Sequence, residues 1–198
     1  HSESSPSNSP SYILQSQSDQ IQNHLIAMHY NLDCSLQEQD KFGEAIQCYR
    51  NALKIDPNYC DAQYNLANAL QLSGQFEDAE QEYLKTIALD PHHQLAYYNL
   101  GYLYFNDLKD PWKGIAMLKK SLEIDPRDVD AQINMALALN DLGMLEDVIK
   151  CYQYIIEHNS DCVMAYFNLG NAYLDVGNID EALNCFQQVV MLDPDHAD

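Results

Sequence analysis

The sequence AQYNLANALQLSGQFEDAEQEYLKTIALDP, residues 62–91, decides the fold of this chain. Apolar residues recur at helical spacing on both sides of Gly74, and Asp-Pro ends the segment, so the stretch predicts two helices joined by a tight turn. The same Asp-Pro pair ends four such segments, at residues 56–57, 90–91, 125–126 and 193–194. The successive prolines are 34, 35 and 68 residues apart, and the last interval is two units of 34, with Ser160 where the middle proline would stand. A period of this length is typical of a helical repeat array.

Aligned on these prolines, the region from residue 26 divides into five units, at about residues 26–59, 60–93, 94–128, 129–162 and 163–196. Position 7 is apolar in every unit: Leu32, Leu66, Leu100, Met135 and Leu169. Position 24 is large and mostly aromatic: Tyr49, Tyr83, Leu118, Tyr152 and Phe186. Position 20, where two helices must approach closely, is alanine in three units: Ala45, Ala79 and Ala182.

These positions resemble the pattern of the tetratricopeptide repeat family. The resemblance implies an all-α fold, an α-solenoid in which five tandem helix-turn-helix repeats form a right-handed superhelix. We expect this domain to span residues 19–198. Residues 1–18 are rich in Ser, Asn, Gln and Pro, a composition that buries too little apolar area to offset chain entropy, so they predict a disordered or peptide-like leader. Its apolar trio, residues 12–14, leaves open that the leader docks into the groove of the repeats.

The third unit carries one residue more than the others, within NDLKDPWKG at residues 106–114. We expect the extra residue to be absorbed before the second helix of the unit. Asp110 can cap that helix, and Pro111 suits its first position, where a missing N–H costs nothing. Trp112, the only tryptophan, is expected to pack over this loop, and an exposed contact residue on the rim is the alternative.

The charge balance limits the classes of partner. The chain has 10 Lys and Arg against 30 Asp and Glu, a formal net charge of −20. Nucleic-acid affinity depends on basic residues that displace counterions, so a nucleic-acid partner is disfavoured, as is an anionic membrane surface. No apolar run is long enough to span a bilayer. A neutral or basic protein is the natural complement.

Position 6 is asparagine in all five units: Asn31, Asn65, Asn99, Asn134 and Asn168. Asparagine is unfavourable inside helices because its side chain competes for backbone hydrogen bonds. Positions 3, 7 and 10 already supply the buried stripe, and position 6 lies too far from the helix start to cap it. A solvated face, or duplication of one ancestral unit, remains an alternative. We interpret the asparagines as a ladder of carboxamides that stands clear of the packed helices and holds the backbone of an extended peptide.

The resemblance supports this interpretation. The superhelix of O-linked N-acetylglucosamine transferase is similar, and asparagines at the same position line its lumen and bind substrate backbone. The segments NLAN at 65–68 and NLGN at 168–171 look most like that enzyme's repeats, and they add Asn68 and Asn171 at position 9. Nothing in the chain resembles the enzyme's catalytic domain.

Aromatic residues accompany the ladder on the first helix of several units. They stand at positions 5, 9 and 12: Tyr64, Tyr98, Phe167, Tyr102 and Phe105. Aromatic side chains are good anchors for a bound peptide. Packing against the adjacent helix is an equal alternative for each of them.

What the sequence lacks is also informative. No Lys or Arg falls on a first helix, so the clamp with which co-chaperone members of this family grip a terminal carboxylate is missing. The sequence has no phosphate-binding glycine loop and no HExxH or GxSxG motif, and its six cysteines form no CxxC pair. We expect no enzymatic activity, no cofactor and no metal, and free thiols in the cytoplasm or nucleus.

The sequence therefore predicts a protein–protein interaction scaffold that binds a neutral-to-basic extended peptide along a concave groove. One alternative is the substrate-recruiting part of a larger enzyme similar to O-linked N-acetylglucosamine transferase. Another is a structural module that self-associates through its C-terminal repeat or N-terminal tail. The last helix, at about residues 180–192, is too apolar to end a solenoid in solvent, so we expect further repeats or another copy to cover it.

Overall fold

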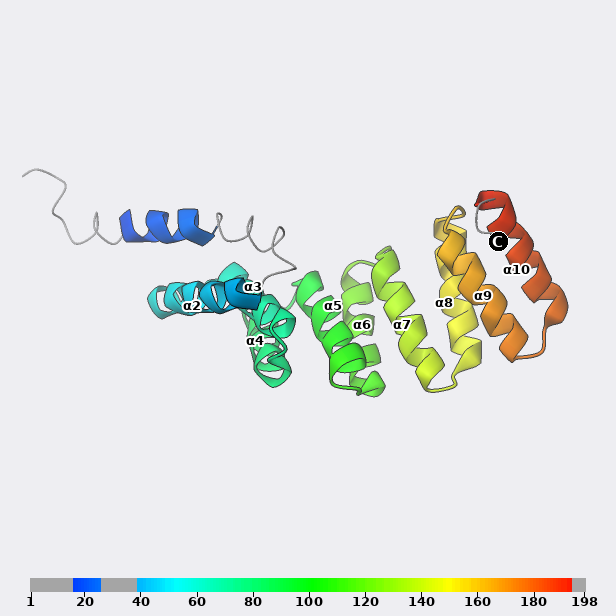
Figure 1. Cartoon of the computed structure of the whole chain (residues 1–198), viewed down its shortest axis with the longest axis horizontal. Helices are drawn as coiled ribbons and strands as arrows, with labels where there is room; N and C mark the ends of the chain where they lie inside the picture. The colour runs from blue at the N-terminus through cyan, green and yellow to red at the C-terminus, as the bar shows by residue number, and fades with distance from the viewer. Residues whose placement is uncertain (1–15, 26–38, 194–198) are drawn as a thin grey trace, which may run out of the picture. The chain divides into compact units, whose positions relative to one another are not determined.

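The computed structural model describes residues 16–25 and 39–193, and within these ranges the regular structure is entirely helical (Figure 1). The prediction of an all-α fold is confirmed. The chain forms two compact units, His1–Pro91 and His92–Asp198.

The first unit contains a helical segment at residues 16–25, followed by α2 (Gln39–Ile55), α3 (Cys60–Leu72) and α4 (Phe76–Leu89). Helix α2 packs against α3, and α3 packs against α4. Gly74 ends the turn after α3 with a φ of 78°, a left-handed conformation that glycine adopts without a steric penalty.

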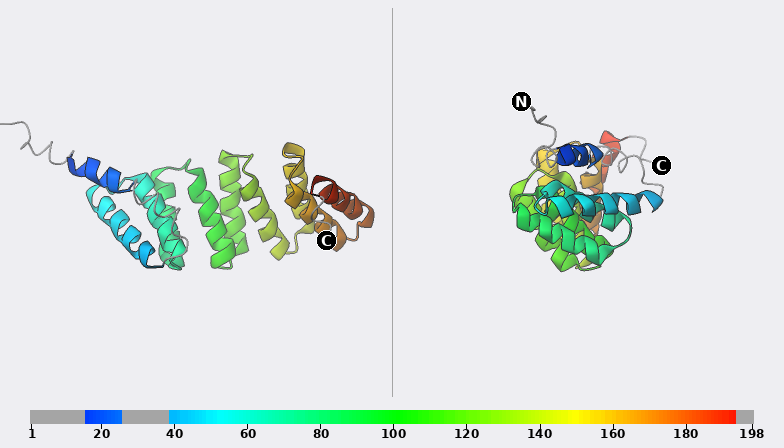
Figure 2. Two further views of the ribbon diagram at one scale, coloured as in Figure 1. Left: turned by 45° about the horizontal axis from the view of Figure 1, so that its top comes forward. Right: turned by 90° about the vertical axis from the view of Figure 1, so that its left-hand side faces the viewer.

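The second unit contains α5 (Gln94–Tyr102), a π-helical turn η2 (Leu103–Asp107), α6 (Pro111–Ile124), α7 (Val129–Asp141), α8 (Leu145–His158), α9 (Val163–Asp175) and α10 (Ile179–Leu192). Each helix packs on the next one along the chain, as both figures show (Figures 1 and 2). The first helices of repeats two to five begin at Cys60, Gln94, Val129 and Val163, which is position 1 of each repeat.

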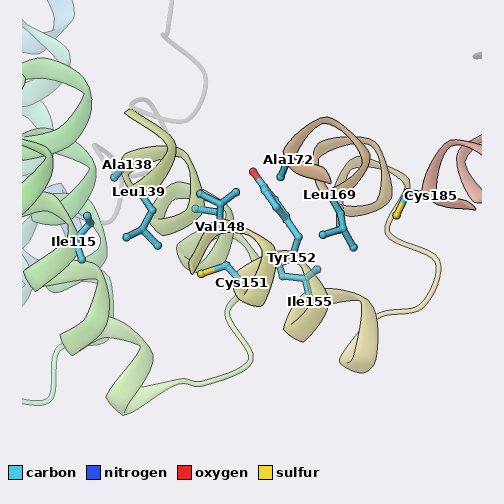
Figure 3. Packing of buried hydrophobic residues seen from close by; sticks show 12 residues of the cluster. Ile115, Ala138, Leu139, Val148, Cys151, Tyr152, Ile155, Leu169, Ala172 and Cys185 are labelled. Atoms are coloured by element: carbon cyan, nitrogen blue, oxygen red, sulfur yellow. The ribbon is translucent and has the colours of Figure 1, made fainter. Parts of the chain in front are cut away.

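A continuous core runs through the second unit from α6 to α10 (Figure 3). Small residues let the helices approach: Ala136 on α7 and Ala172 on α9 are buried in this core. Tyr152 and Ile155 on α8 fill the space against α9. The repeats are therefore held together by a shared apolar seam rather than by separate cores.

The extra residue of the third repeat is absorbed before α6, as predicted, through the turn η2. Its widened hydrogen bond joins the Leu108 amide to the Leu103 carbonyl, five residues back, at 2.9 Å. Asp110 then caps α6 by accepting from the Lys113 amide at 3.1 Å, and Pro111 is the first residue of the helix. The expectation for Trp112 is wrong, because this side chain is 63% exposed.

Candidate functional site

The position-9 asparagine of the second repeat is tied into the first unit by hydrogen bonds. The hydroxyl of Tyr83, on α4, lies 2.5 Å from Asn68 Oδ1 and 2.8 Å from Gln71 Oε1, both on α3. A phenol carries one proton, so it donates to one of these oxygens at a time. Asn68 is half-buried, and its orientation is fixed by the second helix of its own repeat.

Asn65, at position 6 of the same repeat, is only 4% exposed, and its Oδ1 has no hydrogen-bond partner in the part of the chain that the structure describes. The hydroxyl of Tyr49, on the neighbouring helix α2, is also buried without a partner among these residues. Burial raises the pKa of this hydroxyl to about 12, and the Cys48 thiol adds a smaller effect in the same direction. The first unit thus contains an unpaired buried acceptor and an unpaired buried donor.

In the second unit, two position-6 amides are hydrogen-bonded to phenols. Asn134 Nδ2, on α7, donates to the Tyr98 hydroxyl on α5 at 3.0 Å. Asn168, on α9, is hydrogen-bonded to the Tyr152 hydroxyl on α8. Figure 3 shows the ring of Tyr152 with its hydroxyl at the end nearest Ala172 of α9. Asn134 and Asn168 are both half-buried.

These contacts correct one part of the sequence-based expectation. The carboxamides of Asn65, Asn134 and Asn168 do not stand clear of the packed helices: the first is buried, and the other two bind phenols of the preceding repeat. A carboxamide has two N–H donors and an oxygen, so a single hydrogen bond leaves groups available for a ligand. Asn99 and Asn171 are half-buried, and Asn31 lies outside the described residues.

The aromatic residues divide between packed and exposed positions. The rings of Tyr64 and Tyr83 pack at a centroid distance of 6.2 Å, and Phe105 contacts the core of the second unit. Tyr102 and Phe167 are exposed, the latter with its ring edge-on to Phe186 at 6.0 Å. Only the exposed pair offers substantial free ring surface to a ligand.

Charged side chains are distributed unequally between the first and second helices of the repeats. The ion pairs that the structure describes lie on second helices or at their starts. Their charged atoms are 2.6 to 3.8 Å apart: Lys85–Glu82, Lys113–Asp110, Lys120–Glu123 and Lys150–Asp147. The first helices α3, α5, α7 and α9 have no Lys or Arg. Asp130, exposed on α7, is close enough to raise the pKa of Tyr98 further, after burial, the larger cause. The phenol–amide pair of Tyr98 and Asn134 therefore lies in a negative environment.

Other candidate sites have little support. Among the described residues, no three His, Cys, Asp or Glu side chains come together as a metal site would require. His93, which follows His92 in the loop before α5, caps that helix by accepting from the Ala96 amide at 3.2 Å. A cleft of about 510 Å³ lies between residues 17–25 and α2, and none of the position-6 amides described above lines it. Within the described parts of the chain, no helix is both long and apolar enough to cross a bilayer.

The phenols at position 24 were missed as partners of the ladder. The sequence holds only part of the signal: Tyr152 precedes Asn168 by 16 residues, but the same spacing separates Tyr49 from Asn65, whose hydroxyl and carbonyl oxygen are unpaired within the described residues. Position 24 was interpreted only as a large packing residue. Which hydroxyl reaches which amide depends on how two repeats pack, and a repeat alignment does not contain that information.

Comparison with known proteins identifies the repeats. Models described as tetratricopeptide repeat or TPR repeat match residues 36–74, 60–93, 95–128 and 163–196, together more than half of the chain. A search of curated protein sequences found no significant match.

Solved structures agree with this. A crystal structure of MamA is 26% identical with a TM-score of 0.74, over 80% of this chain and 92% of that one. MamA from Desulfovibrio magneticus RS-1 is 19% identical with a TM-score of 0.77, over 91% and 97%. YrrB, described as a TPR protein with an unusual peptide-binding site, is 22% identical with a TM-score of 0.69, over 79% and 80%. The fold is that of these helical solenoids, and the chain belongs to the tetratricopeptide repeat family.

Proposed function

We propose that this chain is a non-enzymatic scaffold that binds an extended segment of another protein through the asparagines of its first helices. The observation that carries the proposal is the environment of Asn134 and Asn168. Both are half-buried, both are hydrogen-bonded to a phenol of the preceding repeat, and both retain hydrogen-bonding groups for a ligand. Such amides can bind peptide N–H and C=O groups without reading the peptide's side chains.

Charge favours a neutral or basic segment. The net charge of −20, the absence of Lys and Arg from the first helices and the exposed Asp130 would all attract Lys and Arg side chains. The exposed rings of Tyr102 and Phe167 would supply apolar contacts. We therefore expect binding to weaken as salt is added, because exposed charges are screened within about 10 Å at 0.1 M ionic strength.

The similarity to YrrB supports a peptide ligand, since that protein has the same fold and a peptide-binding site. We propose no nucleic-acid or membrane ligand, no cofactor and no metal. The free thiols of Cys48, Cys60, Cys151, Cys162 and Cys185 fit a reducing compartment, so we place the protein in the cytoplasm or nucleus.

The test compares two double variants in binding to a pooled library of unstructured peptides of about ten residues, with zero to three lysines each. A peptide of this length spans roughly 33 Å when extended. Asn134→Ala/Asn168→Ala removes two ladder amides, and Asn51→Ala/Asn184→Ala removes two exposed amides from second helices. Each lost peptide hydrogen bond should be worth about 0.5–1.5 kcal/mol. The ladder variant should bind about 5- to 100-fold more weakly than wild type, and the control should bind normally; equal loss in both would refute the proposal.

One alternative is that the repeats recruit substrates for an enzyme, as the similarity of NLAN and NLGN to O-linked N-acetylglucosamine transferase suggests. The asparagines would then bind the backbone of the enzyme's substrate protein, so the peptide test applies equally. A catalytic domain encoded in the same gene would favour this alternative over a free-standing scaffold.

Self-association is favoured by a separate observation on α10. Leu183 and Val190 are 56% and 47% exposed, whereas the residues at the same repeat positions on α6, Ile115 and Leu122, are buried where α7 packs. Leu183→Glu/Val190→Glu should abolish any concentration-dependent increase of mass in sedimentation. Trp112→Glu, which changes an exposed apolar residue elsewhere, should not. A wild-type protein that stays monomeric at high concentration would exclude this role.

A further inference from the structure

The structure assigns Tyr98 and Tyr152 as positioning residues of the asparagine ladder: each phenol binds the position-6 amide of the next repeat and fixes how that amide faces a ligand. This inference rests on the proposed function, because it concerns how the ladder is prepared for a peptide. Both tyrosines act on the peptide through the asparagines rather than as its main contacts.

The first step is the pairing of each amide with a phenol of the preceding repeat. Asn134 Nδ2 donates to the Tyr98 hydroxyl at 3.0 Å. Asn168, on α9, is hydrogen-bonded to the Tyr152 hydroxyl on α8. Figure 3 shows that hydroxyl at the end of the ring nearest α9.

The second step is that the phenol stands at a different repeat position in the third and fourth repeats. The third repeat has Tyr98 at position 5 and the aliphatic Leu118 at position 24. The fourth repeat has the reverse, Ile133 at position 5 and Tyr152 at position 24. The third and fourth repeats thus each supply one phenol to the amide that follows, from one of two places. If only apolar packing mattered, the hydroxyl would not be needed in either place.

The third step concerns what the bond leaves for a ligand. A carboxamide has two N–H donors and one oxygen, so a single hydrogen bond to a phenol leaves hydrogen-bonding groups for a ligand. An asparagine without such a partner samples a broad range of χ2 and must be ordered when a ligand binds. A fixed amide avoids that loss of entropy and presents its remaining groups to a peptide backbone in one direction.

The experiment uses NMR of the side-chain amides together with binding to the pooled peptide library. The variants are Tyr152→Phe, the rescue Tyr152→Phe/Ile133→Tyr, and the control Tyr154→Phe. The rescue gives the fourth repeat a phenol at position 5, as the third has. The control removes another hydroxyl of α8, one that donates to the Pro126 carbonyl at 3.2 Å rather than to a ladder amide.

We expect Tyr152→Phe to shift the Asn168 side-chain amide signals and speed their exchange, and to weaken peptide binding about three- to tenfold. The rescue should restore both readouts, and the control should change neither. Unchanged Asn168 signals in Tyr152→Phe would overturn the assignment of Tyr152 as a positioning residue. Shifted signals with unchanged peptide affinity would show that the bond serves packing alone, which also overturns it. A wild-type protein that binds no library peptide would refute the proposed function. The NMR result would then still show whether Tyr152 orders the Asn168 side chain.

Discussion

Replacing Tyr49 and Tyr152 by phenylalanine is expected to change the free energy of unfolding in opposite directions. Both residues stand at position 24 of their repeats and both are buried, so each substitution removes a hydroxyl and leaves the ring in place. No cavity larger than an oxygen atom is created, and the difference between the variants therefore reports the hydroxyl alone.

The magnitudes follow from the two environments. The Tyr49 hydroxyl has no partner among the described residues, and a buried unpaired donor costs about 1–3 kcal/mol, so Tyr49→Phe should stabilise the protein by up to that amount. The Tyr152 hydroxyl is hydrogen-bonded to Asn168, and a typical hydrogen bond contributes about 0.5–1.5 kcal/mol. Tyr152→Phe should therefore destabilise the protein by about that much.

Urea denaturation followed by far-UV circular dichroism measures both effects. Repeat arrays can unfold in more than one step, so the midpoints should be compared only where the slopes agree with wild type. If Tyr49→Phe is as destabilising as Tyr152→Phe, the Tyr49 hydroxyl has a partner in solution, and the reasoning from its unpaired state is refuted. Asn65, with its own unpaired oxygen on the next helix, would be the first candidate for that partner.

Two further predictions test buried groups and close packing. Burial raises the pKa of Tyr49 and Tyr152 to about 12 and that of Cys151 to about 11, so the folded state holds these protons more tightly than the unfolded state. Their contribution to stability is complete below about pH 8, where both states keep these protons, and it is lost as pH rises toward 12, so urea midpoints that stay constant from about pH 8 to 11 would contradict it. Gly101→Ala should destabilise by about 1–3 kcal/mol, because its Cβ would lie 2.7 Å from a buried leucine side chain and 3.1 Å from a carbonyl of α6. Gly43→Ala, in an open part of α2, should instead stabilise by about 0.5–1 kcal/mol in the same denaturation assay, and similar losses in both variants would count against this packing argument.

The sequence predicted the fold well because the relevant information is local and repeated. Helical spacing recurs in every repeat, the turn glycine in three repeats and the closing proline in four, and the first helices of the last four repeats begin where the alignment starts them. Asp110 and Pro111 specify the start of α6 through their own chemistry and need no distant partner. The π-helical turn before α6 was not predicted, because an insertion shows only that a residue must be absorbed and not which hydrogen-bond ring absorbs it.

The site was predicted less completely because it depends on contacts between repeats. The recurrence of asparagine identified the position, yet the burial of Asn65 and the phenol partners of Asn134 and Asn168 arise from packing of residues 16 to 36 positions apart. The exposure of Trp112 is similar, since the sequence shows a large apolar residue but not whether a neighbour covers it.

The phenol contacts change how peptide binding would be linked to the solenoid itself. An amide held by the preceding repeat keeps its orientation only while the two repeats stay packed, so any loosening between α8 and α9 would disorder Asn168 as well. A peptide bound to the ordered amide would in turn favour the packed arrangement, because ligands stabilise the state that binds them. Stability and affinity should therefore change together when Tyr152 is altered. They should separate when an exposed contact such as Phe167 is altered, since that ring can lose a ligand contact without weakening the joint between repeats.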